Sequence, residues 1–249
     1  MFFICGGENA NMNPVHILAK PEDLAQKALI AGDPGRVKKI SEFLDKPKLV
    51  NDNRGFLVYT GNYKGSKVTI ATHGIGGPST AIVVEELHML GVKTFIRLGT
   101  AGSLVPTLKI GDVLVATGAS HLPGGTIGQY VGQGVTISPA PDIALTMALT
   151  QKLRERGINF REGMLFSSDA FYAEDSSFVQ KWSSLGNLAV EMECATLFSL
   201  GRLRGLRTAA SVIISDELAG ETKWIDRSTL ESKVEQVSKA VLEVLAEAG

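Results

Sequence analysis

The chain has 249 residues, of which 44% are hydrophobic and 20% are charged, and its formal net charge is −1. This length and composition predict a globular protein with a large core, and the near-neutral charge disfavours general attraction to nucleic acid or to an anionic membrane. No apolar run is long enough to span a bilayer, and two cysteines cannot form a disulfide framework, so we expect a cytoplasmic protein.

Residues 1–11 are predicted to be an N-terminal extension, because the polar stretch 8–11 separates a short apolar start from Met12. That start is too short and too uncharged to predict a secretory signal. Residues 12–249 contain no low-complexity linker and no repeat, and we expect them to form one domain.

Short apolar runs alternate along the rest of the chain with segments of helical periodicity. The runs predict buried strands, two of which flank a hairpin turn at 62–65. The predicted strands are 28–31, 56–59, 68–71, 94–98, 113–116, 188–190 and 209–214, and the predicted helices are 79–90, 143–156 and a last one capped by Ser228 and Glu231. This alternation favours an α/β protein with three α/β/α layers and a central mixed sheet.

A glycine-rich turn at 32–36 follows the first predicted strand. Gly32 and Gly35 permit close backbone approach, the turn's amides can face an anion, and Arg36 adds a forked donor. Arg36 considered alone would more often be a surface residue. The turn is therefore one candidate part of an anion site.

Arg97 lies within a buried apolar strand, and glycines and hydroxyls follow it in a second turn-like segment at 99–103. A buried, unpaired guanidinium is unfavourable, so Arg97 must meet a carboxylate or a bound anion. The carboxylate alternatives are Glu85 and Glu86. Because Thr100 supplies an adjacent hydroxyl donor, the pattern favours the anion.

A third glycine-bearing turn, at 73–79, resembles a dinucleotide-binding fingerprint. Ser79 replaces its last glycine, however, and Arg97 stands where a ribose-binding acid is expected. The segment therefore predicts a tight turn with Pro78 at a helix start, and an NAD site is disfavoured.

Two carboxylates, Glu191 and Glu193, follow the apolar run 188–190 where the pattern becomes helical. Ligands in open α/β sheets bind beyond the carboxyl ends of strands, so this pair beside the thioether of Met192 suits a polyhydroxylated ligand such as a sugar. The alternative is a solvated strand end. Another acid, Asp216, ends the strand 209–214, where it is either a buried proton donor or a helix N-cap.

Several of these motifs together resemble one known family. The matching segments are 31–36, 53–55, 73–76, 97–100, 190–193 and 215–216. In order and spacing they are similar to the hexameric, bacterial-type nucleoside phosphorylases, and the match runs from Met12 nearly to the C-terminus. Segments 12–17 and 168–175 most resemble archaeal 5′-methylthioadenosine phosphorylases.

The resemblance implies a nucleoside phosphorylase fold and an attack of phosphate on C1′ of a purine nucleoside. The expected substrate is 5′-methylthioadenosine. It implies that Asp216, as donor to N7 of the base, and Arg97 are catalytic. The implied phosphate ligands are Gly32, Arg36, Arg97, Thr100 and, from a neighbouring subunit, Arg54. The implied nucleoside ligands are His16 (also from the neighbour), Phe171, Val190, Glu191, Met192, Glu193 and Ser215.

The resemblance also implies a homo-oligomer, a hexamer built as a trimer of dimers, with phosphate as co-substrate and neither metal nor organic cofactor. The chain departs from the family in two places. The arginine that supports the catalytic Asp in bacterial purine enzymes has no clear match, Arg227 being the nearest candidate. The Gln/Arg pair that recognises uracil in uridine phosphorylases is replaced by Phe171 and Tyr172, which favours purines.

Other functions compatible with the sequence are a purine nucleoside phosphorylase without preference for methylthioadenosine, a hydrolytic nucleosidase of the same superfamily and a non-catalytic nucleoside-binding protein. A nucleosidase has no need of an arginine-lined phosphate site, so Arg36, Arg54 and Arg97 together disfavour hydrolysis.

Overall fold

A computed structural model describes residues 13–132, 134–173, 175–220 and 222–247. The expected extension, residues 1–11, lies outside this range. The strands are β1 (Lys27–Ala31), β2 (Asp45–Asn51), β3 (Val58–Tyr63), β4 (Ser66–Thr72), β5 (Thr94–Ser103), β6 (Val113–His121), β7 (Phe160–Ser167), β8 (Asn187–Glu191), β9 (Arg207–Glu217) and β10 (Lys223–Trp224). The helices are α1 (Pro34–Ser41), α2 (Gly76–Met89), α3 (Gly125–Val131), α4 (Ile143–Glu155), α5 (Ser176–Ser184), α6 (Cys194–Arg204) and α7 (Arg227–Glu247), with short 3-10 turns at Pro21–Asp23, Asn53–Gly55 and Phe171–Ala173.

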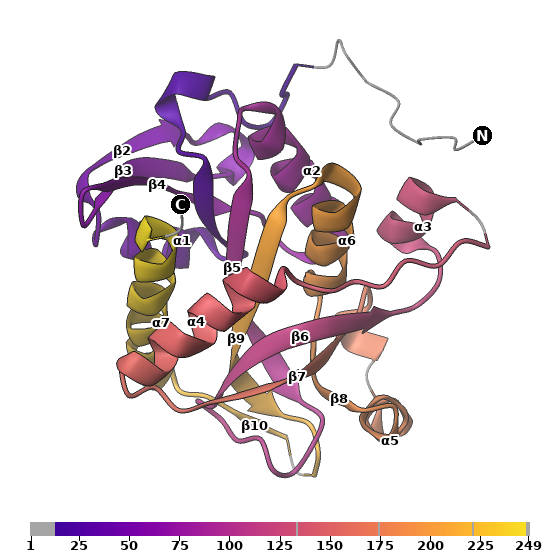
Figure 1. Ribbon diagram of the computed structural model, residues 1–249. Helices are drawn as coiled ribbons and strands as arrows, with labels where there is room; N and C mark the ends of the chain where they lie inside the picture. Colours follow the sequence, from indigo (N-terminus) through magenta and orange to yellow (C-terminus); the bar gives the residue numbers. More distant parts are fainter. Residues whose placement is uncertain (1–12, 133, 174, 221, 248–249) are drawn as a thin grey trace.

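The strands form one mixed sheet in the order β10-β9-β6-β7-β8-β5-β1-β4-β3-β2, and β9 also pairs with β5. That extra pairing closes β9, β6, β7, β8 and β5 into a ring, while β1 to β4 extend from β5 as an open sheet. The pairs β4–β1–β5–β9 are all parallel, so their carboxyl ends meet at one edge. Figure 1 shows this sheet between its helices.

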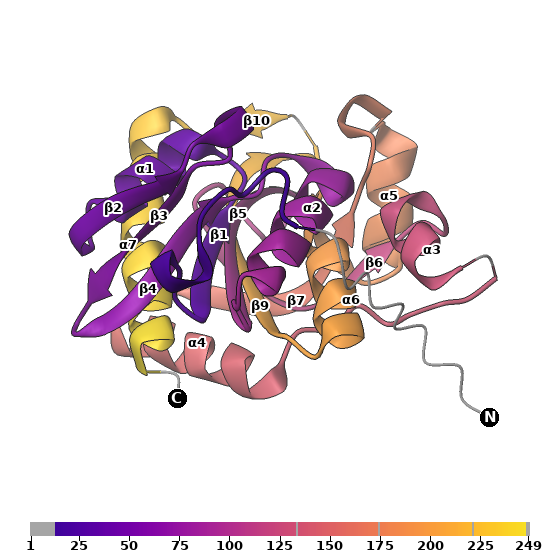
Figure 2. The same cartoon turned by 90° about the horizontal axis from the view of Figure 1, so that it is seen from above.

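Alternation along the strands separates the two large clusters of the core. In β1, Ala28 and Ile30 pack in the cluster that holds the apolar faces of α2 and α6, whereas Leu29 and Ala31 pack in the cluster of α1, α4 and α7. Figure 2 shows these two helix groups on opposite sides of the sheet. The predicted α/β fold with a central mixed sheet is therefore confirmed.

Two local predictions are wrong. Segment 99–103 is no turn, because β5 continues through it and pairs with β9 from Thr94 to Ser103. The last helix is not capped by Ser228, since the carboxylate of Asp226 accepts the amide of Thr229 at 2.9 Å and the helix begins at Arg227.

In the part of the chain that the structure describes, no helix is long and apolar enough to cross a membrane. The same residues contain no cluster of three or more His, Cys, Asp or Glu side chains arranged to hold a metal ion.

Candidate active site

A cavity of about 520 Å³ lies beyond the carboxyl ends of β1, β4, β5, β8 and β9. It gathers most of the residues that the sequence predicted, from segments as distant as 32 and 216. The predicted residues that line it are Gly32, Arg36, Arg97, Thr100, Phe171, Val190, Glu191, Met192, Glu193, Ser215 and Asp216. This position is the one expected for a ligand site in a parallel α/β sheet.

One end of the cavity holds two guanidinium groups, those of Arg36 and Arg97. Gly32 lies between β1 and the turn after β4, where a Cβ would come within 2.8 Å of the carbonyl of Gly74. The half-buried Arg36, on the first turn of α1, donates to the carbonyl of Leu98 at 3.2 Å. Burial and the nearby charge of Arg97 lower the pKa of the Arg36 guanidinium, although Asp33 opposes this. An anion bound here would relieve that repulsion.

Arg97 is paired with carboxylates in this structure, and not with the Glu85 or Glu86 that the sequence offered. Its Nη2 donates to Oε2 of Glu193, and its Nη1 lies 3.3 Å from Oε2 of Glu191. A Cβ at Gly99 would overlap the guanidinium, which is why a glycine is needed in this strand. The salt bridge does not remove Arg97 from the candidate anion site, because the paired Arg97 still lines the cavity.

Glu191 and Glu193 are buried, with exposures of 4% and 6%, so the alternative of a solvated strand end is wrong. Glu191 accepts the amides of Glu193 and Cys194, both at 2.9 Å, and the hydroxyl of Ser167. It thereby caps α6 and fixes the loop that carries Met192. In this structure Glu191 positions the start of α6 and the loop before it. Glu193 is the better candidate for accepting hydrogen bonds from a ligand.

Glu193 has two fixed partners on opposite oxygens. Its Oε1 accepts the amide of Gly76 at 2.7 Å, and its Oε2 accepts Arg97. Burial would raise the pKa of Glu193, but Arg97 and these hydrogen bonds outweigh burial and lower it. Glu193 is therefore an anion and a hydrogen-bond acceptor at neutral pH.

His73, for which the sequence suggested no role, lies near Arg97 and Glu193. Its side chain is fully buried, its Nδ1 lies 3.3 Å from Oγ1 of Thr80, and its Nε2 has no partner among the described residues. Burial and the charge of Arg97 lower the pKa of His73 to about 3. The imidazole is therefore neutral and adds no charge to the anion site.

The opposite end of the cavity holds Asp216, in β9 and not at a helix N-cap. Burial raises the pKa of Asp216, while a hydrogen bond of 2.7 Å from the Ser215 hydroxyl opposes the rise. A Cβ at Gly102 would lie 2.6 Å from Oδ2 of Asp216, so this glycine makes room for the carboxyl group. Raised pKa and access to a cavity are the properties that a proton donor needs.

Arg227, the sequence's candidate for assisting Asp216, is not in this cavity. Its side chain is 89% exposed and pairs with Glu231 one turn along α7. The residue beside Asp216 is instead Trp224, on β10, which sequence reasoning did not find. Its only sequence signal was an aromatic residue eight positions after a strand-ending acid.

His16 and Arg54 do not line this cavity either. They lie together, with His16 Nε2 3.5 Å from Arg54 Nη1, and Nδ1 of His16 lies 2.7 Å from Oε1 of Glu86. Arg54 has a φ of 54°, in the left-handed region that disfavours residues with a Cβ. Such strain is frequent at functional positions.

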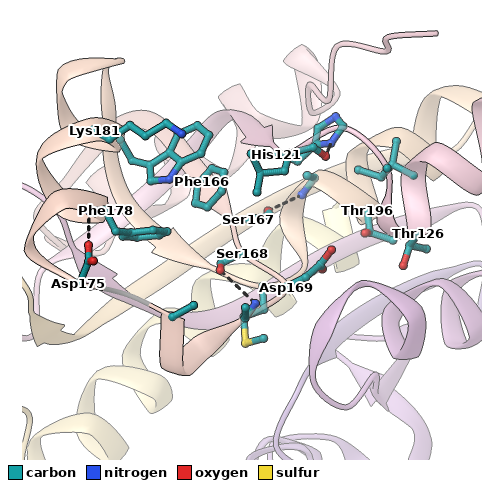
Figure 3. Close-up of a pocket in the computed structure, with 18 of the residues that line it drawn as sticks. His121, Thr126, Phe166, Ser167, Ser168, Asp169, Asp175, Phe178, Lys181 and Thr196 are labelled. Atoms are coloured by element: carbon teal, nitrogen blue, oxygen red, sulfur yellow. Dashed lines mark hydrogen bonds between the residues drawn. The ribbon is translucent and has the colours of Figure 1, made fainter. Parts of the chain in front are cut away.

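A second cavity, of about 370 Å³, lies on the other side of the loop between β8 and α6. Met192, in this loop, lines both cavities. Figure 3 shows Phe166 and Phe178 on one side of it and Thr126 and Thr196 on the other. Its wall includes Ser167, whose hydroxyl donates to Glu191 and accepts the amide of Ala195 at 2.9 Å. The second cavity is thus connected to the first through the cap of α6.

Comparison with known proteins gives consistent matches. The family model described as the phosphorylase superfamily matches residues 26–246. A guanosine phosphorylase of Halorubrum lacusprofundi is 39% identical over 212 residues, covering 85% of this chain and 87% of that protein. The crystal structure of purine nucleoside phosphorylase from Toxoplasma gondii in complex with immucillin-H has a TM-score of 0.85 and 27% identity, covering 94% of this chain and 95% of that chain. For uridine phosphorylase from Vibrio fischeri the TM-score is 0.84 and the identity 28%, with 95% and 98% covered.

Proposed function

Since the chain belongs to the phosphorylase superfamily, we propose that it catalyses the phosphorolysis of purine nucleosides. In this reaction an oxygen of inorganic phosphate forms a bond to C1′ while the bond from C1′ to the base nitrogen breaks. The bonding electrons leave with the base, which takes a proton at N7, and ribose 1-phosphate is the second product.

One observation carries this proposal: the cavity has two arginines at one end, with Glu193 beside Arg97, and a buried, protonatable Asp216 at the other end, farther along β5 and β9. Arg36 and Arg97, with the Thr100 hydroxyl and the Gly32 backbone, form the phosphate end. Holding phosphate next to C1′ accelerates its attack by proximity, and neither a covalent intermediate nor a cofactor is required.

The sugar lies between these ends in our proposal. Glu193 accepts its hydroxyls, and the thioether of Met192 packs against its apolar face. The base then reaches Phe171, Val190 and Ser215, and Asp216 delivers its proton to N7. General acid assistance of this kind is typically worth about 10²–10⁴-fold in rate.

We further propose that the active site is shared between subunits of a homo-oligomer, which by resemblance is a hexamer. Arg54 and His16 do not line the cavity of their own subunit. Arg54 is exposed, and its backbone has the strained left-handed conformation. In a shared site, Arg54 adds a third guanidinium to the partner's phosphate and His16 approaches the 5′ position of the sugar.

Subunit mixing tests the shared site. Arg54→Ala and Asp216→Asn should each lose most activity, but co-expression of the two variants should restore part of it, because some mixed sites combine an intact Arg54 with an intact Asp216. Asp216→Asn mixed with Gly102→Ala serves as the control, since both residues lie in the same cavity of one chain. Activity no higher in the first mixture than in the control would contradict sharing.

The finer choice of substrate is part of the proposal. We propose 5′-methylthioadenosine as the preferred nucleoside, with adenosine, inosine and guanosine as further substrates. The exposed, apolar side chain of Ile75, which lines the cavity, suits a substituent without a hydroxyl. A panel of these four nucleosides and uridine, assayed with phosphate, decides the order, and a higher kcat/KM for guanosine would reject the methylthioadenosine preference.

Phosphate dependence tests the reaction class. Base release from inosine should require phosphate, and ribose 1-phosphate should form in equal amount. Undiminished base release in phosphate-free buffer would identify a nucleosidase instead. A protein that binds nucleosides without turnover in either buffer, and whose binding survives Asp216→Asn, would be a non-catalytic binding protein.

A further inference from the structure

The short strand β10 places one large aromatic residue beside the proposed proton donor. Trp224 pairs directly opposite Asp216 in the antiparallel ladder of β10 and β9. The amide of Ile225 fixes this register by donating to the carbonyl of Ser215 at 2.7 Å. Residues directly opposite in an antiparallel pair project from the same face of the sheet. Trp224 and Asp216 therefore line the same cavity, as observed.

The two tryptophans of the chain have very different surroundings. Trp182 is 8% exposed and stacks on Phe166, with ring centroids 3.6 Å apart. Trp224 is 61% exposed, and no ring contact to it occurs among the described residues. An indole left open to solvent at a cavity is an available surface for a planar ligand.

A second open aromatic ring lines the same cavity. Phe171 is 47% exposed, and its one ring contact among the described residues is an edge contact with Tyr172. The proton donor is thus accompanied by two aromatic side chains from separate segments, the 3-10 turn after β7 and the strand β10. A flat, apolar ring system with a protonatable edge matches this combination.

We propose that Trp224 is a base-binding residue, whose indole stacks on the purine and covers Asp216 while the base is bound. This inference rests on the proposed function. It assigns Trp224 to the side of the proposed base site that β10 forms. Covering Asp216 excludes water and keeps its proton available, and a two-ring base gains more contact area than a pyrimidine. Base stacking on an aromatic residue is worth about 1–3 kcal/mol, which corresponds to roughly 5- to 150-fold in affinity.

Tryptophan fluorescence tests the contact without relying on turnover. Trp182→Phe leaves Trp224 as the only indole, and we expect inosine in phosphate-free buffer to change its emission. Trp224→Phe leaves only Trp182, and we expect inosine to bind, as measured by calorimetry, without changing emission. Unchanged Trp224 emission at inosine concentrations that calorimetry shows to be saturating would overturn the proposal.

Variants with intact Trp182 provide a second measurement should Trp182→Phe fail to fold. Trp224→Ala should weaken inosine binding roughly 5- to 150-fold, and Trp224→Phe should restore most of it. Lys223→Ala is the matched control, because its neighbour in the ladder is Glu217 and it lies outside the cavity. Equal inosine affinity of wild type and Trp224→Ala would reject the contact.

Failure of the Trp224 contact and failure of the proposed function are distinguishable. The wild-type protein is assayed in parallel for phosphate-dependent release of hypoxanthine from inosine. If wild type turns over but Trp224 reports no binding, only the present inference is wrong. If wild type shows no phosphate-dependent turnover, the proposed function is wrong, whatever the fluorescence shows.

Discussion

Replacing Arg97 with methionine should destabilise the fold as well as abolish phosphate binding. The substitution keeps an unbranched side chain but leaves Glu191 and Glu193 buried without their shared cation. Removing one partner of a buried ion pair typically costs about 3–5 kcal/mol. At about 2–4 °C per kcal/mol for a chain of this size, we expect the Tm to fall by roughly 6–20 °C.

The pH dependence of this loss has a defined sign. In the wild-type protein, burial would raise the pKa of Glu193, but Arg97 and the hydrogen bond from the Gly76 amide lower it. Without Arg97, burial dominates and the folded-state pKa of Glu193 exceeds its unfolded value. The unfolded variant then loses its proton first as pH rises, so the variant should be less stable at pH 8 than at pH 5 relative to wild type.

A second substitution separates the ion pair from the rest of the site. In Arg97→Met combined with Glu193→Gln, the uncompensated charge of Glu193 is gone, and the charge that remains, on Glu191, keeps two backbone amides and the Ser167 hydroxyl as donors. The double variant should therefore be more stable than Arg97→Met alone, with a coupling energy of about 0.5–3 kcal/mol.

Thermal unfolding with and without phosphate is the assay. Phosphate at about 100 times its Kd should stabilise wild type by roughly 2.7 kcal/mol, and neither variant that lacks Arg97 should respond. If the Tm of Arg97→Met lies within about 2 °C of the wild-type Tm and still rises with phosphate, both roles assigned to Arg97 are refuted: it neither stabilises the fold as an ion pair nor binds phosphate.

The remaining predictions concern titration. Ser215→Ala removes a hydrogen bond that lowers the pKa of Asp216, so that pKa should rise and the alkaline fall of kcat should move to higher pH; an unchanged pH profile of kcat would contradict Asp216 as the donor. His73 has a folded pKa of about 3, below its ordinary value of 6.5, so the unfolded chain takes up the proton first and stability falls with pH below 6.5. Between pH 7 and pH 5 this residue should cost wild type about 2 kcal/mol, measured by urea unfolding, and His73→Gln should remove that part of the pH dependence.

Local patterns predicted most of the secondary structure, because periodicity depends on neighbouring residues. β1 and α4 begin and end within a residue of their predicted bounds. Continuation of β5 past Leu98 could not be predicted, since glycines at 99 and 102 are typical of turns. They are needed in a strand only because the side chains of Arg97 and Asp216 occupy the places of their Cβ atoms.

Within the candidate site, the sequence predicted which residues are involved better than what they contact. Arg97 was expected to meet either a carboxylate or a bound anion, but its carboxylate partner, Glu193, lies 96 positions away and reaches it only through the fold. Trp224 was missed because a two-residue strand has no periodicity, and its position depends on pairing with β9. Cross-strand contacts of this kind are absent from any local pattern.

Under the proposed function, the buried pair of Arg97 and Glu193 couples the binding of phosphate to the binding of the nucleoside. In the structure without ligand, Glu193 neutralises Arg97, so neither charge is left unpaired in the core. A phosphate that takes the guanidinium frees Oε2 of Glu193 for a sugar hydroxyl, while Gly76 still holds Oε1. A sugar bound first would have to compete with Arg97 for the same oxygen. By linkage, whatever phosphate contributes to nucleoside affinity through this oxygen, the nucleoside contributes equally to phosphate affinity.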